Sequence, residues 1–159
     1  MQKGLTMKKF YSILFTSLII TSCSKDVFKS YEDRLVGTWH LVDVDRRGFG
    51  GSLNNLAFTE GDFTLERGGR MVYNDLAGKT YEGSWDVRHT TVSNGCTVDQ
   101  DGNQDCSQRH VRSLHVVAID FNNQQVKTED FEEIDFTGTN RFKARIESGL
   151  HTYVFTFRR

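Results

Sequence analysis

The sequence predicts a single domain of the all-β class, built from antiparallel strands. Three observations lead to this prediction. Short segments alternate apolar and polar side chains with a period of two, which is the pattern of a strand with one buried face. Gly, Asn and Asp separate these segments, and the chain has 14 Gly and no Pro, so its turns depend on those residues. The 12 Phe and 5 Tyr among 159 residues also favour sheets over helices.

About eight strands are expected after residue 34, where the alternating runs are clearest. In the last of them, Tyr153, Phe155 and Phe157 share one face, as side chains two positions apart do in a strand. Such regular short runs favour an antiparallel sandwich or barrel. The expected strands are 38–45, 62–66, 70–73, 81–91, 111–121, 125–136 (interrupted near Glu129-Asp130), 141–147 and 152–158.

The N-terminal segment has a different character from the rest of the chain. Lys8 and Lys9 precede a largely apolar stretch, residues 10–20, which is too short to span a bilayer. The stretch ends in Ile20-Thr21-Ser22-Cys23. This order of basic residues, apolar stretch and final cysteine resembles the leader and lipobox of bacterial lipoproteins. The alternatives are an ordinary cleaved signal with a coincidental cysteine, or a buried hydrophobic strand.

The lipoprotein resemblance implies that residues 1–22 are a signal peptide and that Cys23 becomes the lipid-carrying first residue. Its sulfur would take a diacylglyceryl group and its amino group an acyl chain, and several chains together hold a protein on a membrane. Ser24 stands where the family's sorting rules read an Asp as an inner-membrane signal, so we expect the outer membrane of the cell envelope. Residues 23–33 are then a polar tether, and residues 34–159 form the folded domain.

The start of the folded domain also resembles a known family. Its opening is Leu35-Val36-Gly37-Thr38-Trp39-His40-Leu41, and the runs 63–70 and 81–87 follow, the latter with the spacing Tyr-x-Gly-x-Trp. This order is similar to lipocalins, and more closely to small lipocalin-like lipoproteins of the Bacteroidetes. The resemblance implies an up-and-down barrel of about eight strands that can hold a small ligand. It also implies that Trp39 packs at the closed end of the barrel, with Arg158 as the arginine that covers it.

Cys96 and Cys106 are predicted to form a disulfide. Two cysteines remain once Cys23 carries lipid, and disulfides persist in exported proteins. Both lie between expected strands and close one short loop. A metal-binding or nucleophilic pair is the alternative, but no His ligands flank the cysteines at a zinc-like spacing.

The loop between the cysteines contains an acidic run that could suggest calcium. Asp99, Asp101, Asn103 and Asp105 supply alternating oxygen ligands, which Ca²⁺ prefers. However, Gly102 comes after the second of these residues, whereas an EF-type loop places its Gly after the third, and no matching Glu follows. A solvated hairpin tip is the favoured interpretation, so no metal is expected.

Charge and motif content restrict the function classes. A formal net charge of −1 gives the chain no electrostatic reason to bind nucleic acid. The five His are scattered, and the chain has no nucleophile elbow, His-Glu-x-x-His or phosphate-binding glycine loop. We therefore expect a protein that is not an enzyme and has no cofactor.

Two functions remain open from the sequence. The first, which we favour, is an anchored lipocalin-like barrel that binds a small apolar or amphipathic ligand. The second is an envelope interaction or structural module that contacts protein or glycan through loops such as the one between Cys96 and Cys106. Whether the barrel has an open interior bears directly on this choice.

Overall fold

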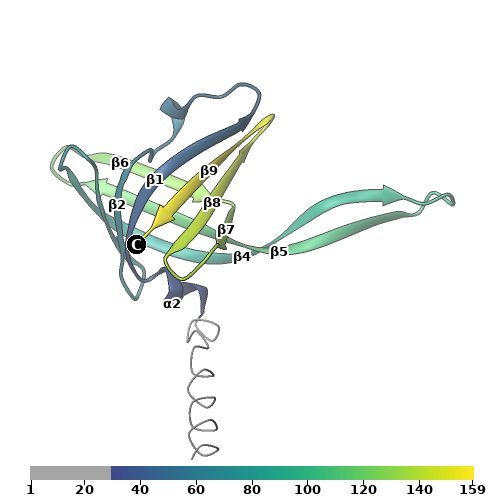
Figure 1. Ribbon diagram of the computed structural model, residues 1–159, viewed down its shortest axis with the longest axis horizontal. Coiled ribbons are helices and arrows are strands. Elements are labelled where there is room, and N and C mark those ends of the chain that lie inside the picture. Colours follow the sequence, from purple (N-terminus) through teal and green to yellow (C-terminus); the bar gives the residue numbers. More distant parts are fainter. Residues whose placement is uncertain (1–29) are drawn as a thin grey trace, which may run out of the picture.

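The computed structural model describes residues 30–159, apart from the side chains of Ser93 and Asn94. The predicted signal peptide and Cys23 lie outside the described residues. A nine-stranded antiparallel sheet forms most of the fold, which confirms the all-β up-and-down prediction (Figure 1). The elements are α2 (Tyr31–Leu35), β1 (Gly37–Gly48), η2 (Leu53–Asn55), β2 (Gly61–Leu65), β3 (Arg70–Asn74), β4 (Thr80–Val98), β5 (Gln104–Asp120), β6 (Gln125–Phe131), β7 (Glu133–Phe136), β8 (Arg141–Ser148) and β9 (His151–Arg158).

The sheet curls into a barrel because its first and last strands pair and its two edges are one continuous chain. The order of neighbours is β6-β5-β4-β3-β2-β1-β9-β8-β7, so β1 lies beside β9. The edge strands β6 and β7 are separated only by Glu132, whose N–H donates to the carbonyl of Arg145 at 2.9 Å. They are two halves of one bent strand, which the sequence predicts as a single strand at 125–136. For this reason about eight strands are expected where nine are found.

The bend in that strand lies at Glu132 rather than near Glu129-Asp130, where the sequence predicts it. Phe131 still pairs with Leu114 of β5, whereas Glu133 already pairs with Arg145 of β8. The chain therefore transfers from one neighbour to the other at Glu132. The adjacent acidic residues at 129–130 indicate a break from sequence, but they lie within a regular ladder.

The interior of the barrel is filled with aromatic side chains. The ring of Phe157 stacks on Phe142 at 4.4 Å and meets Phe63 edge-on at 5.4 Å. Similar edge-on contacts continue outward, and aromatic pairs at these distances add to the energy of burial. The largest fully buried side chains are Trp39, Tyr73, Phe58, Phe131, Phe142, Phe155, Phe157, Leu35, Met71 and Val116.

Gly83 explains the Tyr-x-Gly-x-Trp spacing. Tyr81 and Trp85 point into the core, and Gly83 lies between them on the same face. A Cβ atom on Gly83 would lie 1.8 Å from the carbonyl oxygen of Val117 on β5. Only glycine lets the two strands approach this closely, so the spacing reports strand packing.

The barrel has two distinct ends. The α2 end comprises α2 and the turns at 66–69 and 137–140. The far end comprises the loop at 49–60 and the turns at 75–79, 121–124 and 149–150. The sequence places the start of the folded domain at residue 34, but α2 begins at Tyr31, where the Ser30 hydroxyl accepts a bond from the Asp33 N–H at 3.1 Å.

The loop at 49–60 covers the far end of the barrel. Phe58 is completely buried and meets the rings of Phe63 at 5.1 Å and Tyr73 at 4.9 Å. The backbone of the loop is held as well, because the Ala57 N–H donates to Glu129 at 3.0 Å. This loop closes the end of the barrel where a lipocalin-like ligand site would open.

Candidate interaction site

Strands β4 and β5 extend far beyond the sheet that they share with their neighbours. β3 pairs with β4 only as far as Ser84, and β6 pairs with β5 only from Leu114 onward. Past these points β4 and β5 form ladder pairs only with each other among the described strands. The result is a two-stranded ribbon that projects sideways from the barrel (Figure 1). We call residues 89–110 the arm.

The arm is exposed on both faces. Every residue from Gly95 to His110 is exposed, whereas β5 is buried at every second residue from Leu114 to Asp120. The sequence predicts a loop over most of this segment, and that prediction is wrong. A ribbon without a buried face has no apolar alternation, so the period-two signal that identifies the other strands is absent.

The predicted disulfide is present, and it braces the arm. Cys96 and Cys106 face each other in the register of β4 and β5, ten residues apart in sequence, with their Cα atoms separated by 4.0 Å. The register shifts between Ser93 and Cys96, and Gly95 within this irregularity has φ of 108°. A positive φ is natural for glycine at a bulge, which also increases the local twist of the ribbon.

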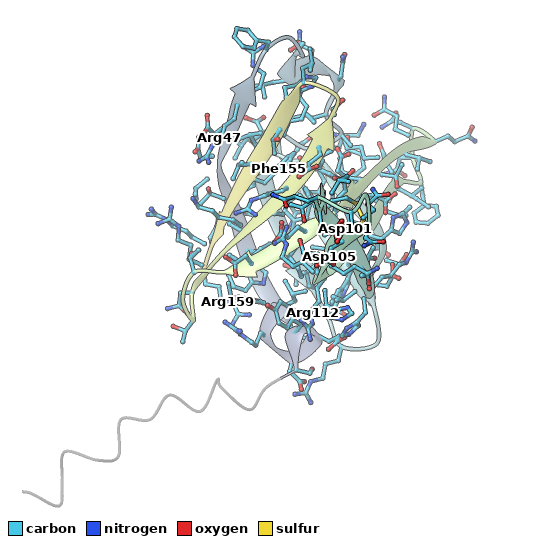
Figure 2. All side chains as sticks on the ribbon, turned by 90° about the vertical axis from the view of Figure 1, so that its right-hand side faces the viewer. Arg47, Asp101, Asp105, Arg112, Phe155 and Arg159 are labelled. Atoms are coloured by element: carbon cyan, nitrogen blue, oxygen red, sulfur yellow. A yellow bond between two sulfur atoms is a disulfide. The ribbon has the colours of Figure 1, made fainter. Side chains whose placement is uncertain are left out.

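The tip of the arm is a tight turn organised by Asp99. Its carboxylate accepts from the N–H groups of Asp101 at 3.0 Å and Asn103 at 2.7 Å, and from the Asn103 side chain at 3.1 Å. The hydrogen bonds from Asn103, followed by those from the Asp101 and Gly102 backbone, hold the pKa of Asp99 below its usual value. Asp99 is therefore occupied by N–H donors, while Asp101 and Asp105 remain exposed (Figure 2).

The candidate calcium ligands do not come together as a cation site. Asp99, Asp101, Asn103 and Asp105 belong to this turn, in which Asp99 accepts from the backbone. In the part of the chain that the structure describes, no group of three or more His, Cys, Asp or Glu side chains could hold a metal ion.

The base of the arm is tied to the barrel by charge. Arg109 donates from Nη1 and Nη2 to the Glu133 carboxylate of β7, which also accepts from Arg145 of β8 at 2.9 Å. Burial favours a higher pKa for Glu133, but the bonds and charges of the two arginines outweigh it and lower the pKa. The carboxylate thus stays ionised and fixes where the arm leaves the barrel.

The predicted cap of the barrel is present, but its arginine is Arg159 and not Arg158. Trp39 is completely buried, and its indole N–H donates to the Leu35 carbonyl at 2.6 Å. The guanidinium of Arg159 lies 4.1 Å from the indole centroid and also donates to the Val36 carbonyl at 2.8 Å. Arg158 follows the inward-pointing Phe157, so strand alternation turns it outward.

Two His–Asp pairs lie on the outer face of the sheet, where sequence patterns gave no signal for them. His40 and Asp62 are register partners on β1 and β2, and their side chains are 2.5 Å apart. His115 and Asp130 are related in the same way on β5 and β6, also at 2.5 Å. The members of each pair are brought together only by strand register. Exposed pairs of this kind contribute little to stability.

The edges of the arm have backbone hydrogen-bonding groups that no neighbouring described strand pairs with. Each strand of a two-stranded ribbon has one row of backbone N–H and C=O groups that point away from its partner. Such a row can pair with an extended segment of another chain. In the barrel, β3 covers the outer edge of β4 as far as Ser84, and β6 covers the outer edge of β5 from Leu114 onward. Beyond these two residues neither edge has a ladder partner among the described strands, and this holds along the whole arm.

No known family model, curated protein or solved structure matches this chain. None of the helices within residues 30–159 is long and apolar enough to cross a membrane.

Proposed function

We propose that this chain is a lipid-anchored protein of the cell envelope whose arm binds a protein partner. The basic residues, apolar stretch and Cys23 at the N-terminus support the anchor. The observation that carries the partner site is the arm itself, a disulfide-braced ribbon with both faces exposed. Formation of the hydrophobic core does not explain why β4 and β5 extend this far, because the arm contributes no residue to the described core.

The chemistry of the arm favours an extended, cationic segment of protein. The open edges offer backbone hydrogen bonds to a strand laid alongside them. Asp101 and Asp105 add negative charge near the tip, which attracts Lys or Arg on the partner. The disulfide holds the ribbon in shape before binding, so less conformational entropy is lost when the partner arrives.

Site-specific photo-crosslinking in cells that express the full chain tests the arm. We expect a photoreactive residue at Thr97 in the arm to give a discrete protein adduct. The same probe at Thr59, an exposed threonine on the barrel, should give none. A variant in which Asn-Gly replaces residues 93–108 joins the register partners Val92 and Arg109 through a two-residue turn, and a probe in its shortened arm should lose the adduct. The absence of an adduct at Thr97, as a glycan partner would give, contradicts the proposal.

The anchor has its own test. Cys23→Ser removes the thiol that would carry lipid, so we expect the variant in the soluble fraction or as an unprocessed precursor. The unchanged chain should stay in the membrane fraction and carry acyl mass on Cys23. A bare thiol in protein from the native host would contradict the anchor and leave the arm proposal intact.

A second candidate function is binding of a small apolar or amphipathic ligand at the far end. Each far-end turn or loop exposes a large apolar side chain, with exposures between 73% and 85%: Phe49, Leu76, Phe121 and Leu150. The interior behind them is occupied by aromatic rings, so a ligand would enter only if Phe58 moved. Native mass spectrometry should then detect a bound lipid-sized molecule whose occupancy rises in Phe58→Ala. A clean protein mass for both forms contradicts this function.

A further inference from the structure

Arginines are concentrated at the α2 end of the barrel. Arg34 lies in α2 itself, with its guanidinium 3.8 Å from the ring centroid of Phe136. Arg112 comes from β5 and lies 4.2 Å from the ring centroid of Tyr31. Figure 2 shows Arg112 and Arg159 together at this end, with Arg47 at a distance from them. Several segments that are far apart in sequence therefore bring arginine to one end.

Stacking leaves these guanidinium groups able to bind anions. A guanidinium that lies over an aromatic ring uses its face, while its N–H donors point outward along its edge. That edge matches the geometry of a phosphate, which accepts two parallel hydrogen bonds. Arg34 and Arg112 remain only partly buried, so solvent and ligands can reach them.

Arg141 and Arg158 form a second part of the same end. They face each other across β8 and β9 as register partners on the outer surface. Like charges at opposed positions destabilise a sheet unless an anion lies between them. Neither arginine makes an ion pair with a described residue, and the Nε of Arg141 is buried without a hydrogen-bond partner.

The acids at this end do not balance these arginines. Asp33 pairs with Arg67, and Asp86 pairs with Arg88. Glu32 and Glu66 remain on α2 and the 66–69 turn, and Asp135 of β7 lies opposite Lys143 of β8. Four arginines at this end make no ion pair with a described residue: Arg34, Arg112, Arg141 and Arg158. The α2 end therefore has an excess of positive charge, which suits an anionic partner.

The short segment between Cys23 and α2 determines which anionic surface lies closest to the α2 end. Ser30 follows Cys23 by seven residues. A fully extended chain of that length reaches only about 25 Å. If Cys23 carries lipid, as the proposed function states, the α2 end is the part of the barrel held closest to the bilayer. This short segment contains Lys25 and Lys29 against Asp26, so it adds one net positive charge.

We propose that the α2 end rests on the anionic phosphate headgroups of the membrane, with Arg34, Arg112, Arg141 and Arg158 as the contacting residues. This inference builds on the proposed anchor and adds an orientation to it. The far-end turns then face away from the bilayer. The arm projects sideways, where a partner at the membrane surface can reach it (Figure 1).

Vesicle binding by the chain that starts at Ser24, and so carries no lipid, tests this surface. All the described strands and the core lie after this point, so the truncated chain keeps the described fold. We expect it to sediment with phosphatidylcholine vesicles that contain phosphatidylglycerol, more strongly at low salt than at high salt. The double variant R141Q/R158Q should bind at least about tenfold more weakly, because each basic residue near an anionic surface contributes about a factor of five.

The matched control is R46Q/R47Q, which removes two arginines of β1 that lie near the far end of the barrel. We expect its vesicle binding to stay within about twofold of the parent, with both double variants melting as the parent does. Equal binding to pure phosphatidylcholine, no binding at low salt, or equal losses in both variants would overturn the inference. If the acylated chain still fractionates with the membrane in that case, the anchor stands and only the orientation fails.

Discussion

Strands β4 and β5 pass through two environments, and their two halves are held by different forces. In the barrel, alternate residues such as Leu114, Val116 and Ala118 are buried against an aromatic core. In the arm, no residue from Gly95 to His110 is buried, and Cys96–Cys106 braces the ribbon covalently. Strand pairing alone therefore does not determine what a segment contributes to the molecule. The barrel half provides stability, and the arm half presents a surface.

The largest expected effect is a difference in stability between a buried and an exposed phenylalanine, each replaced by alanine. Phe157 contacts Phe142, Phe63 and Phe131 and is 2% exposed, so Phe157→Ala should lower the free energy of unfolding by about 3–5 kcal/mol. The control is Phe121→Ala, because Phe121 is 73% exposed and its loss should cost less than about 0.5 kcal/mol. Urea unfolding of both variants measures the difference. Similar losses would show that the barrel is not held by its aromatic core.

The second expected effect is a loss of barrel stability at high pH. Burial, followed by the negative charge of Asp75 and Glu60, raises the pKa of Tyr73 to about 12. The folded state then holds a proton that the unfolded state releases near pH 10, so stability falls as pH rises between these values, by at most about 3 kcal/mol. Tyr73→Phe should remove this dependence. It should also cost about 1 kcal/mol at neutral pH through the lost bond to the Glu60 carbonyl.

A smaller effect distinguishes two neighbouring arginines at the end of β9. Arg159→Gln removes the cation over Trp39 and its bond to Val36, and should destabilise the barrel by about 1 kcal/mol. Arg158→Gln should leave stability unchanged or raise it slightly, because it relieves the opposed charge of Arg141. Thermal unfolding of the two variants side by side decides the assignment, and a larger loss for Arg158→Gln would reverse it.

The smallest expected effect concerns the disulfide. Chain entropy alone would assign about 2–3 kcal/mol to a loop of this length. We expect C96S/C106S to change the unfolding free energy of the barrel by less than about 1 kcal/mol, because the arm can fray while the core stays folded. Limited proteolysis should instead cut the variant within the arm much faster than the parent. A large drop in barrel stability would show that arm and barrel unfold as one unit.

The sequence predicts the barrel well because each barrel strand buries one face. Tyr153, Phe155 and Phe157 alternate as expected, and the strand bounds agree to within a few residues for most of the sheet. The same reasoning fails for the arm, whose polar residues resemble a loop when no buried face marks them. It also fails for α2, which is too short for a helical period to be seen.

The candidate site is predicted only in part, for a similar reason. The Cys96–Cys106 pair is read correctly from the count of cysteines and the expected compartment. The open edges of the arm depend on where β3 and β6 stop pairing, which is a property of three-dimensional register. The choice of Arg158 over Arg159 shows the same limit, since one position of register reverses the direction of a side chain.

If the aromatic core alone holds the barrel together, the barrel folds without the arm, and the shortened-arm variant measures this. Replacement of residues 93–108 by Asn-Gly keeps Val92 opposite Arg109, and with it the Arg109–Glu133 contact at the base. We predict that urea unfolding of this variant gives a free energy within about 1 kcal/mol of the parent. A loss of several kcal/mol, or a variant that does not fold, would show that the arm is a structural part of the barrel.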